Sequence, residues 1–433
     1  MNKTKIPRNI LILGIVSLLT DAATEMIYPF LPLFIATLGS GAVLLGIIEG
    51  IAETTASLLK LVSGIISDKI GKRKALVVVG YTISTFARPL IGVVADAWQI
   101  ALIRTMDRVG KGIRTSPRDA LIASSVTPES RGRAFGFHRA MDHSGAVLGP
   151  LLGIGTIALL ILVFGQHDLS TILRTTFLFA IIPGALAVLT LMLFVKENAV
   201  GHPGRPAFSF SLRSFDAQFK RYLFTVAFFT LGNSSDAFML FRLQETLQNS
   251  TVLHSFISSV PLFAAILDRF AESQTQIQIS NILFLPIIWS FFQVIKALLS
   301  TPLGGLSDRI GRKMSINIGW GIYAAVYAGF ASLEFLSATW QIAGSFGLFT
   351  VYAVYYAFTE GAEKALVADI VPDELRGSAY GLFNFAVGIV ALPASIIFGI
   401  IYSKFGGAAA FGMGAVISLV SMIFLSVGLK ERR

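Results

Sequence analysis

Long apolar stretches separated by short polar segments run through the whole chain. Each approaches or exceeds the roughly 20 residues that a helix needs to cross the hydrocarbon core of a bilayer. They fall at about residues 10–37, 43–66, 75–96, 98–124, 134–164, 174–195, 221–247, 280–305, 314–335, 339–368, 377–403 and 408–429. The pattern predicts an all-α membrane protein with twelve transmembrane helices.

The polar segment at about 196–220 differs from the other connectors. It carries Lys196, Arg205, Arg213 and Lys220 together with glycines and prolines, a composition typical of a linker. Positive charge gathers on the cytoplasmic side of membrane proteins. We therefore expect a cytoplasmic linker at 196–220 between an N-terminal six-helix half (1–195) and a C-terminal half (221–433). Both termini would be cytoplasmic in a multi-pass protein of the inner or plasma membrane.

One short polar phrase occurs twice, each time between two apolar stretches. Glycine permits a tight bend, an aspartate can cap a helix end, and the cations favour the cytoplasmic side. Two such copies indicate a duplicated membrane protein, and we expect them to form a conformational gate. The gate residues are Gly64, Asp68, Gly71 and Arg73 in the first copy, and Asp308, Arg309, Gly311 and Arg312 in the second.

A second echo locates an insertion. Asp21 lies in a Thr-Asp-Ala phrase that recurs as Ser-Asp-Ala around Asp236, and this pair is about 25 residues closer in sequence than Asp68 and Asp308. The extra residues fit about 248–279, which is too polar, and too interrupted by Pro261, to span a membrane. We expect an external loop with a short interfacial helix there. The loop is either a passive connector or a lid or partner surface.

Composition supports the membrane assignment and removes several kinds of chemistry. The 433 residues are 54% hydrophobic and 14% charged, against about 25% charged in soluble domains. The chain has no cysteine, which excludes disulfides, thiolate metal sites and cysteine nucleophiles. We expect no metal or cofactor. The net charge of +10 fits the cytoplasmic bias of cations better than nucleic-acid binding.

Charged residues within the apolar stretches are the candidates for function. An ionised side chain at mid-bilayer costs about 2.5–3.5 kcal/mol on insertion scales, so it must face a cavity or pair. We predict Asp21, Glu25 and Glu53 as proton carriers and Arg104 as the cation that modulates them. Paired residues near the cytoplasmic mouth are the structural alternative for Arg114, Arg118 and Asp119. The predicted substrate-cavity residues are Glu49, Lys60, Asp107, Arg108, Lys111, Asp142, Asp236, Lys296 and Glu360.

The stretch 134–164 contains a glycine-rich phrase. Gly145 and Gly149 are spaced i and i+4, which lets another helix approach closely, and Pro150 removes a helical hydrogen bond. We count all three among the gate residues.

These features together resemble the major facilitator superfamily over essentially the whole chain. The repeated phrase resembles that family's loops between helices two and three and between helices eight and nine. The run Gly145–Gly153 resembles its antiporter signature, with Ile154 in place of the last glycine. The run Arg104–Gly112 resembles a helix-four motif whose arginine is linked to proton coupling. The combination is similar to a poorly characterised prokaryotic branch.

The resemblance implies a secondary transporter that works by alternating access as a monomer, with a small molecule, protons and the bilayer as partners. Our leading hypothesis is proton-coupled export of a small organic solute. The alternative is a proton symporter that imports an organic anion, such as a siderophore or carboxylate. A membrane enzyme or channel is disfavoured because the sequence contains no metal triad, nucleophile elbow or phosphate loop.

Overall fold

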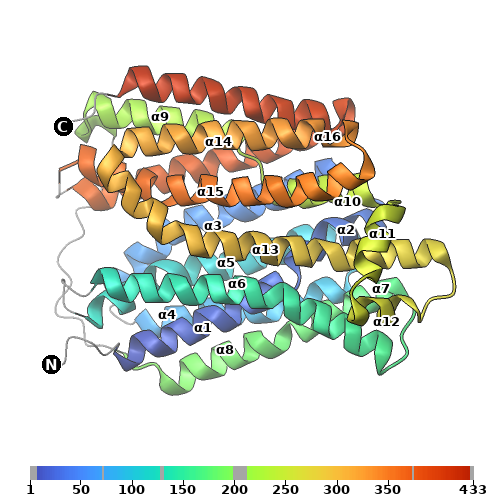
Figure 1. Ribbon diagram of the computed structural model, residues 1–433. Helices are drawn as coiled ribbons and strands as arrows, with labels where there is room; N and C mark the ends of the chain where they lie inside the picture. Colours follow the sequence, from blue (N-terminus) through green and yellow to red (C-terminus); the bar gives the residue numbers. More distant parts are fainter. Residues whose placement is uncertain (1–6, 71–72, 127–130, 198–211, 373–374, 430–433) are drawn as a thin grey trace. The chain divides into compact units, whose positions relative to one another are not determined.

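A computed structural model describes residues 7–70, 73–126, 131–197, 212–372 and 375–429 (Figure 1). All regular elements in these ranges are helices. Ten candidate spans among them are long and apolar enough to cross a membrane. The predicted all-α membrane fold is therefore confirmed.

The described residues form two compact units. The first lies within Met1–Leu31 and Ile51–Pro206, and the second within Pro32–Gly50 and Ala207–Arg433. The helices from the N-terminus to the linker are α1 (Arg8–Glu25), η1 (Tyr28–Phe30), α2 (Leu31–Thr37), α3 (Ala42–Ile70), α4 (Arg73–Ala87), η2 (Arg88–Val93), α5 (Ala97–Ser124), α6 (Arg131–Leu162), α7 (Leu169–Phe179) and α8 (Ile181–Phe194). Most of α2 and the first part of α3 belong to the second unit.

The remaining helices all belong to the second unit. They are η4 (Leu212–Ser214), α9 (Ala217–Gly232), α10 (Ala237–Leu247), α11 (Thr251–Ser258), α12 (Pro261–Leu267), α13 (Ser273–Ile310), α14 (Arg312–Ser332), η5 (Leu333–Phe335), α15 (Ala338–Ile370) and α16 (Arg376–Gly428).

Two features reconcile the ten candidate spans with the twelve predicted helices. Helix α16 contains Gly406 with φ 85° and ψ 167°, a conformation outside any helix, so it is two helices joined at a kink. Glycine alone adopts this backbone region readily. Helix α5 is not among the ten, because its many charged residues lower its hydropathy. Counting α5 and dividing α16 at Gly406 gives the twelve helices of the sequence prediction within the described ranges.

Several helices begin where a polar side chain caps them. Asp96 accepts a hydrogen bond from the Trp98 amide at 2.7 Å, and the Gln99 side chain bonds back to the Asp96 amide, which completes a capping box. The side chains of Asp168 and Asp216 likewise accept hydrogen bonds from backbone amides at the starts of α7 and α9. Side chains of this kind satisfy amide groups that the first helical turn leaves without partners.

The insertion is more ordered than the sequence predicts. Two short helices, α11 and α12, occupy it instead of one. Pro261 is the first residue of α12, a position that suits its fixed φ. Leu253, Ile257 and Ile266 are almost fully buried. His254 Nδ1 lies 3.1 Å from the Ser280 hydroxyl on α13. The insertion is therefore packed onto the other helices of the second unit.

Candidate functional site

Helix α5 carries more charged residues than any other helix of the first unit, and glycines fix its position. A Cβ on Gly110 would lie 2.5 Å from the Gly80 carbonyl oxygen of α4, and one on Gly112 would lie 2.4 Å from Leu59 Cβ of α3. The helix is therefore in close contact with α4 and α3 on either side. This contact brings its cations toward the carboxylates of neighbouring helices.

A buried ion pair anchors the middle of α5. Asp107 Oδ1 accepts a hydrogen bond from Arg88 Nε at 2.8 Å, and Arg104 Nη1 lies 3.9 Å from Asp107 Oδ2. Arg88 also donates to the Thr20 carbonyl of α1 at 3.1 Å. Arg88 and Asp107 are 5% and 1% exposed. Arg88 was not among the predicted residues. Its position as a lone arginine within the apolar stretch 75–96 could have identified it as a functional candidate.

Helix α6 holds the two carboxylates of α1 at close range. A Cβ on Gly145 would lie 2.3 Å from the Leu18 carbonyl oxygen and 3.0 Å from Asp21 Cβ. A Cβ on Gly149 would lie 2.6 Å from Glu25 Cβ. The contact between α6 and α1 therefore contains both the glycines of α6 and the predicted proton carriers of α1. Pro150 follows within the same helix.

Further charged residues of α3, α5 and α6 join this cluster. The Glu53 carboxylate interacts electrostatically with Lys60, Lys111, Arg108 and Arg104. Asp21 interacts with Asp142, Lys111 and Glu25. Asp142 also accepts a hydrogen bond from Ser17 and lies 3.7 Å from His138 Nδ1. The structure thus brings nine predicted residues together in the first unit: Asp21, Glu25, Glu53, Lys60, Arg104, Asp107, Arg108, Lys111 and Asp142.

A second cluster surrounds Asp236 at the start of α10. Its carboxylate accepts hydrogen bonds from the Tyr352 hydroxyl at 2.6 Å and from the Tyr356 hydroxyl at 3.1 and 3.2 Å. Lys296 Nζ lies 3.9 Å from the centroid of the Tyr356 ring. Glu49, on the part of α3 that belongs to this unit, accepts from the Ser235 hydroxyl at 3.1 Å.

Glu360 follows Tyr356 by one turn of α15. The predicted residues Glu49, Asp236 and Lys296 therefore lie near one another, but the tyrosines between them were missed. Their signal was present, because Tyr352, Tyr355 and Tyr356 are spaced i, i+3 and i+4 on one helix face.

Only part of the predicted gate lies among the described residues. Gly71 and the side chains of Asp68 and Asp308 fall outside them. Gly311 separates α13 from α14 with φ 93°, which suits glycine. Arg312 donates to the Ser307 hydroxyl at 2.5 Å and lies 3.6 Å from Asp369 Oδ2.

The first copy makes comparable contacts. Arg73 Nη1 donates to the Ala120 carbonyl at 3.4 Å. A Cβ on Gly64 would lie 3.4 Å from Ser116 Cβ. Arg309 is exposed. Among the described arginines of the repeated phrase, Arg73 and Arg312 therefore each contact a neighbouring helix near its end, whereas Arg309 does not show such a contact.

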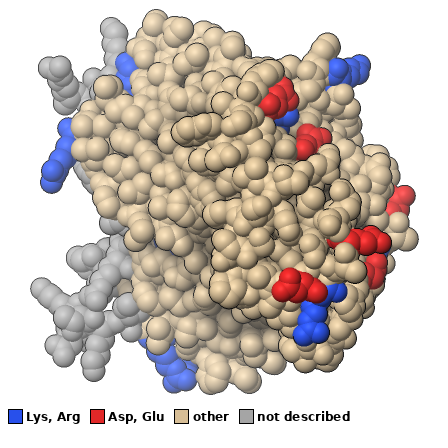
Figure 2. Space-filling view, turned by 45° about the vertical axis from the view of Figure 1, so that its right-hand side comes forward, with Lys and Arg blue, Asp and Glu red and all other residues tan. Residues whose placement is uncertain are grey.

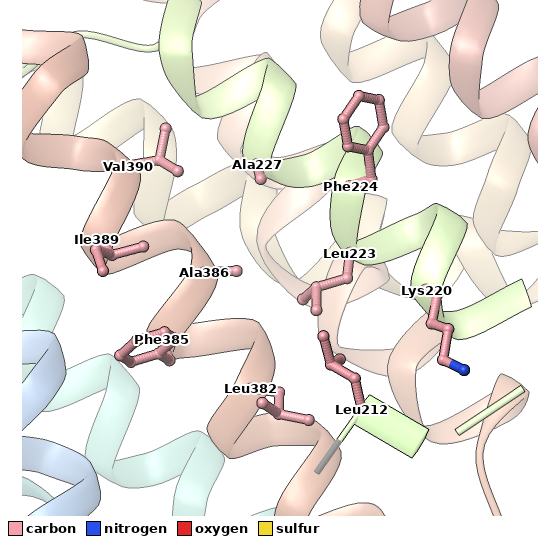
Figure 3. Close-up of a pocket in the computed structure, with 10 residues that line it drawn as sticks. All are labelled: Leu212, Lys220, Leu223, Phe224, Ala227, Leu382, Phe385, Ala386, Ile389 and Val390. Carbon is pink, nitrogen blue, oxygen red and sulfur yellow. The ribbon is translucent and has the colours of Figure 1, made fainter. Parts of the chain in front are cut away.

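A separate groove lies between α9 and the first part of α16 (Figure 3). It has a volume of about 430 Å³ and its single charged lining residue is Lys220. None of the predicted site residues lines it, and its apolar walls suit a lipid chain better than a charged solute. Figure 2 shows a face of the molecule on which charged side chains are sparse, as expected for a surface in contact with lipid.

Membrane-crossing helices with clusters of buried charge define the class as a multi-pass transporter. The family model described as Major Facilitator Superfamily matches residues 13–273 and 250–433. The chain therefore belongs to the major facilitator superfamily, whose members are secondary transporters rather than enzymes.

Three known proteins illustrate what this chain is similar to. An uncharacterised MFS-type transporter of Methanocaldococcus jannaschii is 33% identical over 426 residues, covering 98% of this chain and 96% of that protein. Multidrug resistance protein MdtH of Salmonella paratyphi C is 30% identical over 129 residues, covering 30% of this chain and 32% of that protein. The crystal structure of a point mutant of the nucleoside transporter NupG has a TM-score of 0.70 at 18% identity, covering 97% of this chain and 100% of that one. This last likeness is one of fold.

Proposed function

We propose that this protein exports a small organic solute in exchange for protons across the inner or plasma membrane. It does so as a monomer with two six-helix halves, 1–195 and 221–433, and with both termini in the cytoplasm. The observation that carries the proposal is the contact between α6 and α1. Gly145 and Gly149, which belong to the antiporter-like phrase, lie against Asp21 and Glu25.

The proposed mechanism uses the charged cluster of the first unit. A carboxylate among Asp21, Glu25 and Glu53 accepts a proton on the outside and releases it inside. Neutralisation removes the cost of keeping a charge in a dry environment. Because Glu53 interacts with Arg104, Arg108, Lys60 and Lys111, its protonation changes the balance of charge around α5. That change biases the equilibrium between the two access states.

The partial match to a multidrug resistance protein supports export as the direction of transport. A specific observation also favours the second candidate, import of an organic anion with protons. The cations of α5 could bind an anionic solute, since Lys111 and Arg108 interact electrostatically with each other. The nearby carboxylates of Asp21 and Glu53 oppose such an anion, which is why export ranks first.

The experiment begins with a thermal-shift screen of the purified protein against organic anions, cationic drugs and siderophores at two pH values. A ligand that binds the folded state raises its apparent stability by mass action. The stabilising compound is then tested in proteoliposomes that contain a pH-sensitive dye. Compound-driven proton movement should be lost in Asp21→Asn or Glu53→Gln while the thermal shift remains.

Asp268→Asn serves as the control, because Asp268 is exposed in the insertion. It should move protons at the wild-type rate. Undiminished proton movement in both Asp21→Asn and Glu53→Gln would refute the assignment of the proton carriers. Proton movement in the same direction as the compound would favour the symporter.

A further inference from the structure

We propose that the second-unit cluster around Asp236 binds the ammonium group of an organic cation, and that Lys296 occupies the position of this ammonium when no substrate is present. The proposal rests on the proposed function and deepens it by naming the class of substrate. It applies to solutes that carry a protonated amine next to an aromatic or other apolar body.

The first argument is the place of the Lys296 ammonium. Its nitrogen lies 3.9 Å from the centroid of the Tyr356 ring, within the distance at which a cation is attracted to an aromatic face. The hydroxyl of the same tyrosine donates to both carboxylate oxygens of Asp236. The structure therefore contains an ammonium group on the face of an aromatic ring whose hydroxyl binds the Asp236 carboxylate.

The second argument is the balance of charge. Asp236 interacts electrostatically with Lys296 and also with Glu49, and Glu49 is only 6% exposed. Glu360 lies one turn beyond Tyr356 on α15. An anionic solute at this position would face these carboxylates, whereas a cation would be attracted to them.

The third argument is the set of aromatic rings around Asp236. The Phe292 ring stacks on Tyr352 at a centroid distance of 5.5 Å and lies 6.0 Å from Tyr356. Trp289 packs against Phe292 at 5.0 Å. These rings come from α13 and α15, the helices that also supply Lys296 and the two tyrosines. An aryl group attached to the amine would find aromatic partners beside Asp236.

Lys296 can leave this position because its ammonium sits on a flexible four-carbon stem. A tethered group competes with a free ligand at a high effective concentration. Removing the lysine ammonium while keeping a side chain of similar length should therefore strengthen binding of an organic amine. An anion-binding role for Lys296 predicts the opposite, because the same change would remove the group that binds the anion.

The test uses two probes that differ only in the charged group at the end of the chain. Tryptamine and indole-3-propionate carry the same ring and chain, ending in an ammonium and a carboxylate respectively. Binding of each radiolabelled probe to the purified full-length chain is measured by equilibrium dialysis, with thermal unfolding as the check on folding. Lys296→Met should bind tryptamine about 3- to 10-fold more tightly than the wild type, and Asp236→Asn at least about 10-fold more weakly.

Two further variants separate the ring from its hydroxyl. Tyr356→Leu should weaken tryptamine binding about as much as Asp236→Asn, because it removes the aromatic face. Tyr356→Phe keeps the face and should retain most of the affinity. Lys404→Met is the matched control, because Lys404 is exposed on α16 and its loss should leave both probes unaffected.

The proposal is overturned if Lys296→Met leaves tryptamine binding unchanged or weaker, or if neither probe binds the folded wild-type protein. Binding of indole-3-propionate that disappears in Lys296→Met also overturns it and favours the anion symporter. The outcome is independent of proton coupling. A protein that binds tryptamine as expected but moves no protons would refute the proposed antiport and leave this inference intact.

Discussion

At the scale of single residues, the buried charges differ in what holds them. Asp107 is fixed by Arg88 and approached by Arg104. Asp236 is held by two tyrosine hydroxyls. An arginine holds Asp107, whereas neutral hydroxyls hold Asp236. We therefore propose that Asp107 has a positioning role and that Asp236 is the one available to a substrate.

The positioning role of Asp107 leads to a stability prediction. Asp107→Asn should destabilise the protein by roughly 3–5 kcal/mol, because it leaves Arg88 as a buried charge without its partner. Thermal unfolding of the detergent-solubilised protein is the measurement. Asp119→Asn is the control on the same helix, since the Asp119 side chain is 43% exposed beside Arg118 and exposed pairs contribute little. Equal stability of the two variants would contradict the positioning role.

Sequence reasoning identified most of the charged residues of the two clusters, with Arg88 as an exception, but it did not identify their partners. An ionisable residue within an apolar stretch is visible in the sequence because its presence there is costly. Its partner is not visible when the two are distant in the chain. Tyr352 and Asp236 are 116 positions apart, and their contact depends on how α15 packs beside α10. Arg88 and Asp107 are 19 positions apart, and their contact depends on how α4 and η2 pack beside α5.

At the scale of elements, glycine determines how closely the helices of the first unit approach. The contact of α6 with α1 has no space for side chains at Gly145 and Gly149. The sequence predicted the close approach from the glycine spacing, but it could not identify α1 as the neighbour. With α1 in that position, the antiporter-like phrase and the predicted proton carriers become parts of one interface.

Replacement of Gly149 should disturb this interface. The added side chain of Gly149→Val would collide with Glu25 and with the Ala22 carbonyl oxygen, and a close-packed helix contact has little room to relax. We expect a protein that inserts and binds solute but loses coupled export and leaks protons. The measurement is the decay of an imposed pH gradient in proteoliposomes, with and without the solute.

The same helix supplies the control. A Cβ on Gly155 would meet nothing within 4 Å, so Gly155→Val should hold the gradient as well as the wild type. If Gly149→Val also holds the gradient and exports normally, the glycines of α6 serve packing alone. The symporter would then become the better proposal.

At the scale of the whole molecule, the two units contain sites of different chemistry on elements that echo each other in sequence. Asp21 and Asp236 occupy matching phrases, yet Asp21 lies among cations and carboxylates and Asp236 among aromatic rings. The matching phrases therefore lie in surroundings of different chemistry. Such a difference suits a carrier in which one unit handles the proton and the other the solute.

The orientation of the whole chain in the membrane can be tested directly because the protein contains no cysteine. A single introduced cysteine therefore reports its own location with a membrane-impermeant maleimide. Ser255→Cys, on an exposed position of α11 in the insertion, should react in intact cells. Arg213→Cys, exposed in η4 beside the proposed cytoplasmic linker, should react only after the membrane is opened. The unmodified chain gives the background. Because a polar connector stays on one side of a folded membrane protein, the reverse labelling pattern would invert the proposed topology and place the basic linker outside the cell.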